Sequence, residues 1–285
     1  MEFTKWHGLG NDFVFVEMSP NEISPEKAAA SARKICDRNF GVGGDGLVFV
    51  FRDDQGVFNM RIFNADGTEP EMCGNAIRCV AKYVYTRGMV QETTFPVQTK
   101  AGIKVPEIIL NNGEVTAVKV DMGEPVLDRE LIPVAGQPGS RVIDEELLID
   151  GEPLQITAVS MGNPHCILFV PGADSAPVGT MGPQLESHRH FPAKTNVEFV
   201  EVVNRGEVRA RVWERGVGET LACGTGSCAI AVGGILTGRL EKEVKVNLPG
   251  GSLIVEWNPN NHVYMTGPAE EVFRGRLNPT FLTGD

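Results

Sequence analysis

Short runs of apolar residues, several of them alternating with polar ones, dominate the chain and predict a protein built mainly of strands. Ser24-Pro25-Glu26 supplies a cap, a first-turn proline and an acidic residue, which predicts a helix that continues to about Arg38. A second helix is predicted from about Asn75 to Thr86, where Arg87-Gly88 ends it. The strands predicted in the first half are residues 13–16, 47–51, 58–64, 95–99, 103–110 and 115–122.

The second half of the chain repeats the first. Strands are predicted at residues 166–170, 197–203 and 208–213, and helical segments at 183–190 and from Cys223 to about Leu236. At a fixed offset of 150 residues, positions 49–105 are identical to their partners at ten places, whereas ordinary residue frequencies give about three or four. The identical pairs include Phe49/Phe199, Arg61/Arg211, Glu69/Glu219, Cys73/Cys223, Gly74/Gly224, Ala81/Ala231 and Gly88/Gly238. We therefore interpret the chain as a duplicated domain.

A duplicated chain of this length predicts two domains of the α+β class, each with one helix for several mostly antiparallel strands. We expect residues 1–123, completed by 269–285, to form the first domain and residues 124–268 the second, with the Pro- and charge-rich segment 125–150 crossing between them. Two such domains related by a pseudo-twofold axis are expected to bring equivalent loops to a common cleft, where ligand sites tend to form.

The composition is that of an ordinary globular protein, with 42% hydrophobic and 22% charged residues. The net charge of −11 argues against a broad nucleic-acid-binding surface and against binding to anionic membranes. The most apolar runs, residues 47–51 and 228–236, are far shorter than the ~20 residues that span a bilayer. Residues 1–7 lack the layout of a secretory signal, so we expect a cytoplasmic protein.

The six cysteines indicate thiol chemistry at two positions. They show no Cys-x-x-Cys pair and no zinc-ligand spacing, so no metal site is predicted. Cys36, Cys79 and Cys228 lie in apolar or helical stretches and are expected in the core. Cys73 and Cys223 each close a Gly-rich turn and begin a helix. At a helix start, unpaired N–H groups and the helix dipole lower the pKa of a thiol from about 8.5 toward ~3.5–7.5.

Two such thiols at one ligand predict stereoinversion by acid–base catalysis. A thiolate on one face of a substrate α-carbon can remove its proton while a thiol on the other face delivers one, with no metal or pyridoxal cofactor. The two helix N-termini can hold the substrate carboxylate and stabilise the charge that develops. A buried structural cysteine and a redox pair are the alternatives. The duplicated Cys-Gly setting favours catalysis over both.

Polar residues near the two junctions fit a small charged substrate. Arg215 can hold a carboxylate by a bidentate fork, and Glu214 can accept hydrogen bonds from an ammonium group. Each nearby asparagine taken alone is better explained as a turn former. Together we interpret them as a binding set, which comprises Asn11, Asn64, Asn75, Asn163 and Asn196.

Several long motifs, in the same order along the whole chain, resemble the diaminopimelate epimerase family. They are residues 5–13 (KWHGLGNDF), 63–67 (FNADG), 73–75 (CGN), 161–165 (MGNPH), 214–220 (ERGVGET), 223–226 (CGTG) and 248–251 (LPGG). The resemblance implies a cofactor-independent enzyme that interconverts LL- and meso-2,6-diaminopimelate in lysine and peptidoglycan precursor synthesis. It also implies two halves, each with strands wrapped around a central helix, and a homodimer.

The resemblance further implies a role for each site residue. Cys73 and Cys223 would be the acid–base thiols, and the reacting carboxylate would rest on the backbone of Gly74–Asn75 and Gly224–Thr225. His165 and Glu214 are similar in position to family residues that influence the thiols. The distal amino-acid end of the substrate would be read by Asn64, Asn196, Glu214 and Arg215, with Asn11 and Asn163 completing the site.

The chain departs from the family pattern at two positions and leaves two alternatives. Gly46 stands where some members carry Gln, so a side-chain contact is absent there, and Thr225 stands where others carry Ser. One alternative is a proline or hydroxyproline racemase-like enzyme of the same architecture. A cyclic imino acid would leave Glu214-Arg215 without a partner, and those relatives tend to carry His where Asn75 stands. The other is a thiol-based redox sensor or a non-catalytic amino-acid-binding protein.

Overall fold

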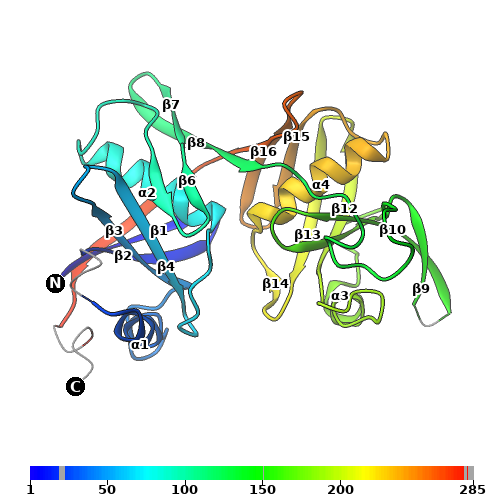
Figure 1. Ribbon diagram of the computed structural model, residues 1–285, viewed down its shortest axis with the longest axis horizontal. Coiled ribbons are helices and arrows are strands. Elements are labelled where there is room, and N and C mark those ends of the chain that lie inside the picture. Colours follow the sequence, from blue (N-terminus) through cyan, green and yellow to red (C-terminus); the bar gives the residue numbers. More distant parts are fainter. Residues whose placement is uncertain (19–22, 150, 279–280, 282–285) are drawn as a thin grey trace. The chain divides into compact units, whose positions relative to one another are not determined.

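The structure, a computed structural model, describes residues 1–18, 23–149, 151–278 and 281. The chain folds as two compact units, the first comprising Met1–Val120 with Gly267–Asp285 and the second Asp121–Thr266. Each unit consists mostly of strands with one long helix among them (Figure 1). Asp150 of the predicted crossing segment, and residues 279–280 and 282–285 of the predicted C-terminal completion, lie outside the described residues. None of the described helices is long and apolar enough to cross a membrane.

The first unit is built on a seven-stranded sheet with the order β18-β1-β2-β3-β4-β5-β6. Its strands are β1 (Glu2–Gly8), β2 (Asn11–Glu17), β3 (Gly46–Arg52), β4 (Phe58–Asn64), β5 (Val97–Thr99), β6 (Gly102–Lys104) and β18 (Glu270–Arg276). Two helices accompany the sheet, α1 (Pro25–Ile35) and α2 (Gly74–Thr86). An antiparallel hairpin of β7 (Glu107–Asn111) and β8 (Glu114–Gly123) follows, and its turn residues Asn112 and Gly113 both have positive φ.

The second unit has the strand order β17-β16-β15-β13-β12-β11-β10-β9, with β14 paired to β13. Its strands are β9 (Glu145–Ile149), β10 (Glu152–Ser160), β11 (Pro164–Phe169), β12 (Asn196–Asn204), β13 (Glu207–Glu214), β14 (Gly218–Thr220), β15 (Glu243–Leu248), β16 (Gly251–Trp257) and β17 (Val263–Gly267). Its helices are α3 (Val178–Glu186) and α4 (Gly224–Leu236).

The two units share one topology. Strands β1 to β6 of the first unit correspond to β10, β11, β12, β13, β15 and β16 of the second, and every corresponding pair of neighbours has the same relative direction. An added antiparallel strand, β18 or β9, lies beside the first strand of each series. Helices α1 and α3 follow the second strand of each series, and α2 and α4 precede the fifth. The predicted duplication and the α+β class are therefore confirmed.

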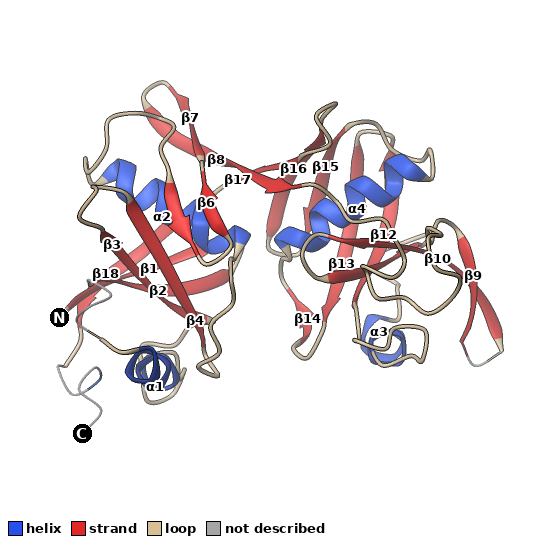
Figure 2. Ribbon diagram, viewed as in Figure 1, coloured by secondary structure: helices blue, strands red, loops and turns tan. Residues whose placement is uncertain are grey.

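Each sheet carries a long helix on one face and a short helix on the other (Figure 2). In the first unit, Val14 and Val16 share a core with α1, whereas Trp6 and Phe15 pack against Tyr83 of α2. The alternation of side chains along a strand places these two groups on opposite faces. Helix α4 is apolar on nearly all sides, and this composition is typical of a helix that is buried all round.

Three of the predicted elements have other bounds in the structure, and strands β1, β9, β10 and β14 to β18 were not predicted. Helix α1 ends at Ile35 rather than near Arg38, because the following loop folds back and the N–H groups of Val42 and Gly43 both donate to the Ile35 carbonyl. Helix α3 lies at Val178–Glu186, earlier than the predicted 183–190. The predicted strand 103–110 is divided into β6 and β7 around Pro106, which has no N–H to donate.

The segment predicted to cross between domains instead belongs to the second unit. Ile132 and Val142 are fully buried in the same apolar core as strands β10 to β12. Arg129 is also buried, and its guanidinium donates to Ser140 Oγ, the Ala135 carbonyl and the Glu145 carboxylate. High proline and charge content therefore marks an irregular but packed segment here.

Substituting Gly41 should destabilise the first unit. A Cβ at this position would lie 2.3 Å from the Lys34 carbonyl oxygen and 2.5 Å from that of Ile35, and neither backbone atom can move without disturbing the end of α1. We expect Gly41→Ala to lower the free energy of unfolding by about 2 kcal/mol or more, as overpacking does. Urea unfolding followed by circular dichroism measures the change.

Gly179→Ala is the matched control for this prediction. A Cβ on Gly179 meets nothing within 4 Å, and the residue lies in α3, where alanine has the better helix propensity. The free energy of unfolding of this variant should equal that of the parent protein or be slightly higher. Equal stability of the Gly41 and Gly179 variants would contradict the close packing of the loop on α1.

Candidate active site

The two predicted thiols occupy the same position in the two units. Cys73 is the N-cap of α2 and Cys223 the N-cap of α4, and both have extended backbone (φ −138°, ψ 119° and φ −125°, ψ 113°). Each cysteine carbonyl accepts the first helical hydrogen bond, from Ile77 N–H or Ser227 N–H. The sequence prediction that both cysteines begin helices is confirmed. Cys36, Cys79 and Cys228 are buried in the core, also as predicted.

Cys73 borders a hydrogen-bonded network of side-chain amides. Its Sγ lies 3.9 Å from Asn11 Oδ1, which also accepts a hydrogen bond of 3.0 Å from Asn75 Nδ2. The buried Arg78 guanidinium donates to Asn75 Oδ1 and to the Gly74 carbonyl, and so holds the first turn of α2. Asn11 and Asn75, predicted as members of one binding set, are therefore in direct contact.

A cluster of charged side chains holds Asn11 in place. Asn11 Nδ2 donates to Asp45 Oδ2 over 2.7 Å, and Arg38 bridges Asp45 and Asp12. Burial by itself raises the pKa of Asp12, but hydrogen bonds from Arg38 and Lys5 and the charge of Lys5 outweigh it and lower this pKa to about 2. The Asp12 carboxylate is therefore charged at neutral pH, and the bond to Asp45 gives Asn11 one preferred orientation.

Cys223 has a different environment from Cys73. Its side chain is buried, and Sγ accepts a hydrogen bond of 3.3 Å from Gly226 N–H and lies 3.5 Å from Thr225 Oγ1. Burial, and then the charges of Glu214 and Glu198, raise the pKa of Cys223 well above its ordinary value. The prediction of a lowered pKa at the helix start is wrong for this thiol, because burial and two carboxylates outweigh the helix dipole.

A buried histidine and glutamate stand beside Cys223. His165 Nδ1 lies 2.6 Å from Glu198 Oε1, and neither side chain is exposed at all (0%). The other ring nitrogen of His165, Nε2, lies 3.0 Å from Asn163 Oδ1. The structure thus joins His165 and Asn163, both predicted site residues, through one hydrogen bond.

The residues predicted to read the distal end of the substrate lie at the ends of equivalent strands. Asn64 ends β4 and donates to Thr68 Oγ1, and Glu214 ends β13 and accepts from Thr220 Oγ1 over 2.6 Å. Asn196 is buried and its Oδ1 accepts from the Arg215 N–H, so its visible role is to hold the backbone of that loop. The Arg215 guanidinium is exposed and donates through Nη1 to the Ala193 carbonyl.

Sequence reasoning missed three residues of these networks, Asp45, Arg78 and Glu198. Asp45 had a signal, because a carboxylate beside a Gly-rich turn can bond neighbouring polar groups. Arg78 and Glu198 interrupt apolar segments of a helix and a strand, and a charged residue in such a run is rarely buried without a partner. Neither signal indicates which partner the charge finds.

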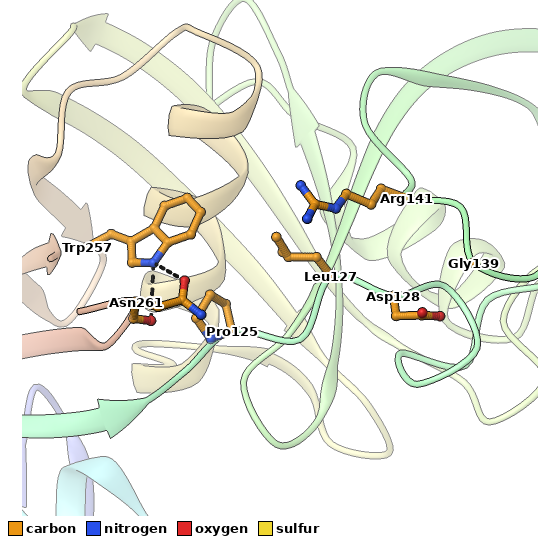
Figure 3. Close-up of a pocket in the computed structure, with 7 residues that line it drawn as sticks. All are labelled: Pro125, Leu127, Asp128, Gly139, Arg141, Trp257 and Asn261. Carbon is orange, nitrogen blue, oxygen red and sulfur yellow. Dashed lines mark hydrogen bonds between the residues drawn. The ribbon is translucent and has the colours of Figure 1, made fainter. Parts of the chain in front are cut away.

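A surface hollow of about 420 Å³ in the second unit is not part of this site. It is lined by Pro125, Leu127, Asp128, Gly139, Arg141, Trp257 and Asn261. The Trp257 indole N–H donates to the backbone and side-chain oxygens of Asn261, and the Arg141 guanidinium points over Leu127 (Figure 3). No thiol and none of the predicted site residues lines it. Within the described residues, no group of three or more His, Cys, Asp or Glu side chains could hold a metal ion.

Comparison with solved structures defines the class of fold. A phenazine biosynthesis protein of the PhzF family from Bacillus anthracis matches with a TM-score of 0.70 at 19% identity, over 98% of this chain and 99% of the other. A hydroxyproline epimerase from Agrobacterium vitis, solved with bound trans-4-hydroxy-L-proline, matches with a TM-score of 0.68 at 14% identity, over 96% of this chain and 91% of the other. The protein therefore has the two-domain fold of these enzymes.

Sequence comparison defines the family. The family model described as diaminopimelate epimerase matches residues 3–127 and 157–272. The diaminopimelate epimerase of Moorella thermoacetica is 55% identical over 276 residues, which cover 96% of this chain and 98% of the relative. That of Heliobacterium modesticaldum is 55% identical over 280 residues, which cover 97% and 99%. The chain belongs to the diaminopimelate epimerase family, and it is an isomerase.

The raised pKa of Cys223 should be visible in its alkylation. Only the thiolate reacts quickly with iodoacetamide, so we expect the alkylation rate of Cys223 in the native protein to keep rising above pH 9. Glu214→Gln removes one of the two charges that raise this pKa and should move the profile to lower pH. Mass spectrometry of the labelled peptides, after timed exposure across a pH series, gives the profile of each cysteine.

Glu219→Gln serves as the control, because Glu219 pairs with Arg211 and is not among the groups that raise the pKa of Cys223. Its profile should coincide with that of the parent protein. A Cys223 rate that has already reached its plateau at pH 7 would show that the dipole of α4 dominates after all.

Proposed function

We propose that this isomerase interconverts LL-2,6-diaminopimelate and meso-2,6-diaminopimelate by a two-thiol mechanism, and so acts in lysine and peptidoglycan precursor synthesis. The observation that carries the proposal is the repetition of one arrangement, a cysteine as the N-cap of a buried helix, in two units of a chain that belongs to this family. A single such cysteine can transfer a proton on only one face of a carbon. Inversion needs a second.

In the proposed reaction, the thiolate of one cysteine removes the α-proton and the thiol of the other delivers a proton to the opposite face. The electron pair left on the α-carbon is delocalised onto the adjacent carboxylate. N–H groups in the first turns of α2 and α4, at Gly74–Asn75 and Gly224–Thr225, are suited to stabilise that charge. No redox equivalent is consumed, and the protonation states of the two cysteines are exchanged when the product forms.

We assign the acid in the free enzyme to Cys223. Its pKa is raised by burial and by Glu214 and Glu198, so it carries its proton at neutral pH and can donate it. Cys73 then acts as the base in the first turnover. Its S–H lies next to Asn11 Oδ1, an acceptor whose position is set by Asp45 and Asn75, so the sulfur has a defined position before it gives up its proton.

The distal, non-reacting end of the substrate is an ammonium–carboxylate pair, and we assign its recognition to Asn64, Asn196, Glu214 and Arg215. The Arg215 guanidinium is suited to the carboxylate by its exposed, planar fork, and the Glu214 carboxylate to the ammonium group. Asn196 contributes by holding the Arg215 backbone: its Oδ1 accepts a hydrogen bond of 2.9 Å from the Arg215 N–H. Asn11 and Asn163 complete the set, and His165 and Glu214 tune the thiols.

Loss of either thiol should abolish the reaction. We expect Cys73→Ala and Cys223→Ala each to lower turnover of LL-diaminopimelate by at least about 10³-fold, since each removes a proton carrier rather than a binding contact. The reaction is followed in deuterium oxide by mass spectrometry and by separation of the stereoisomers. Near-normal turnover by either variant would disprove the two-thiol mechanism.

Cys79→Ala and Cys228→Ala are the matched controls, because these cysteines lie on the same helices and are fully buried away from the helix starts. They should lose stability rather than chemistry. L-Proline and trans-4-hydroxy-L-proline are run in parallel. Deuterium in proline and none in diaminopimelate would reassign the enzyme to the racemase-like alternative.

We also propose that the protein is a cytoplasmic homodimer, the state that the resemblance to the family implies. A sedimentation velocity run at micromolar concentration should give a single species near twice the chain mass of 30.9 kDa. A single species at the chain mass, with full activity, would exclude the dimer as the working form.

A further inference from the structure

Glu198 is a buried carboxylate that the reaction described above does not use. It lies in β12 and is completely buried. Its Oε1 bonds His165, and its Oε2 has no hydrogen-bond partner among the described residues. A buried, unsatisfied carboxylate oxygen costs stability, so its presence calls for an explanation other than packing.

The fold itself does not require a polar pair at this place. In the parallel pair β11–β12, His165 is opposite Asn196, and in the corresponding pair β2–β3, Phe13 is opposite Gly46. Two residues further along, Glu198 of the second unit therefore corresponds to Val48 of the first. Phe13 and Val48 are both buried and apolar, so the same sheet position in the first unit is filled by hydrophobic packing.

The His165 ring connects Glu198 to Asn163, and its two contacts decide which ring nitrogen carries the proton. An amide oxygen can only accept, so the 3.0 Å contact between Asn163 Oδ1 and His165 Nε2 requires the proton on Nε2. Nδ1 then faces Glu198. With Oδ1 turned to the ring, the Nδ2 donor of Asn163 is left with no partner within the described part of the chain, and it is available to a ligand.

The same carboxylate borders the thiol of Cys223. A Cβ placed on Gly226 would lie 2.9 Å from Glu198 Oε1 and 3.2 Å from Cys223 Sγ, so the two groups face the same small gap above the first turn of α4. Their proximity agrees with the contribution of Glu198 to the raised pKa values of Cys223 and of Cys166. Glu198 therefore lies near the Cys223 thiol, and it is linked to Asn163 through His165 by two successive hydrogen bonds.

We propose that Glu198 is a positioning residue of the epimerase reaction, which acts through His165 to fix the Asn163 amide with Nδ2 presented to the substrate beside Cys223. This inference rests on the proposed function. At this sheet position the second unit is polar where the first is apolar, so Asn163 and its counterpart Asn11 are held by different partners. Glu198 touches no reacting atom in this scheme.

Replacing Glu198 with the residue of the first unit tests the proposal. We expect Glu198→Val to lower kcat/KM for LL-diaminopimelate by about ten- to hundredfold, the range typical of lost supporting bonds. Glu198→Gln should recover activity to within about threefold, because its side-chain N–H can donate to His165 Nδ1 and so keep the ring proton on Nε2. Gln also fills the volume of Glu, so the protonation of the His165 ring, and not this recovery, separates positioning from a role in packing alone. Equal loss in both variants, or unchanged kcat/KM in Glu198→Val, would overturn the proposal.

A spectroscopic readout separates positioning from a general loss of structure. The ¹⁵N shifts of the His165 ring report which nitrogen carries the proton. The Nε2–H form should dominate in the parent protein and in Glu198→Gln, and a mixture of tautomers should replace it in Glu198→Val. The same His165 tautomer in all three proteins would show that Glu198 does not set the hydrogen bonding of His165, contrary to the proposal.

Two further variants keep the test interpretable. Glu201→Val removes a carboxylate from the same strand, outside this network, and should leave kcat/KM unchanged. The double variant His165→Phe with Glu198→Val copies the Phe13–Val48 pair, so it should fold with an undiminished melting temperature and yet turn over slowly. If it is as active as the parent protein, the polar pair is dispensable and the inference fails. An inactive parent protein would instead refute the proposed function.

Discussion

The burial of one helix in each unit is the constraint on which the rest of the structure depends. Helices α2 and α4 are enclosed by apolar side chains along most of their length, so the polar N–H groups of their first turns can be reached only at the helix start. A cysteine caps each of these starts. The same geometry that closes the core therefore places a thiol, the backbone N–H groups of a first helical turn and the end of the neighbouring strands at one place in each unit.

The duplication preserves this scaffold and varies its polar residues. In the first unit, Arg78 and Asn75 brace the helix start and Asp45 holds Asn11. In the second unit, Thr225 and Gly226 contact the thiol, and a buried histidine–glutamate pair holds Asn163. Equivalent asparagines, Asn11 and Asn163, are thus fixed by different partners. In the proposed reaction one thiol donates a proton and the other accepts one, and different surroundings suit these two roles.

The different environments also decide how each thiol ionises. Proximity to a helix start lowers the pKa of a cysteine by a fixed dipole, whereas burial raises it by removing water from the thiolate. At Cys223 the second effect is the larger, and Glu214 and Glu198 add to it. The proposed direction of proton transfer in the free enzyme follows from this balance. It is a property of the surroundings of the sulfur and not of the motif that contains it.

The sequence by itself determined the elements whose cause is local: the strands 58–64 and 208–213, the helices begun by Cys73 and Cys223, the hairpin at Asn112-Gly113, and the duplication. Period, caps and turn residues act over a few positions, and a repeat needs only comparison of the chain with itself. The tertiary structure alone decided the end of α1, the packing of residues 125–149, the raised pKa of Cys223, and the partners of Asp45, Arg78 and Glu198. Each of these depends on atoms brought together from distant segments, because desolvation and buried hydrogen bonds are set by what surrounds a group and not by its neighbours in the chain.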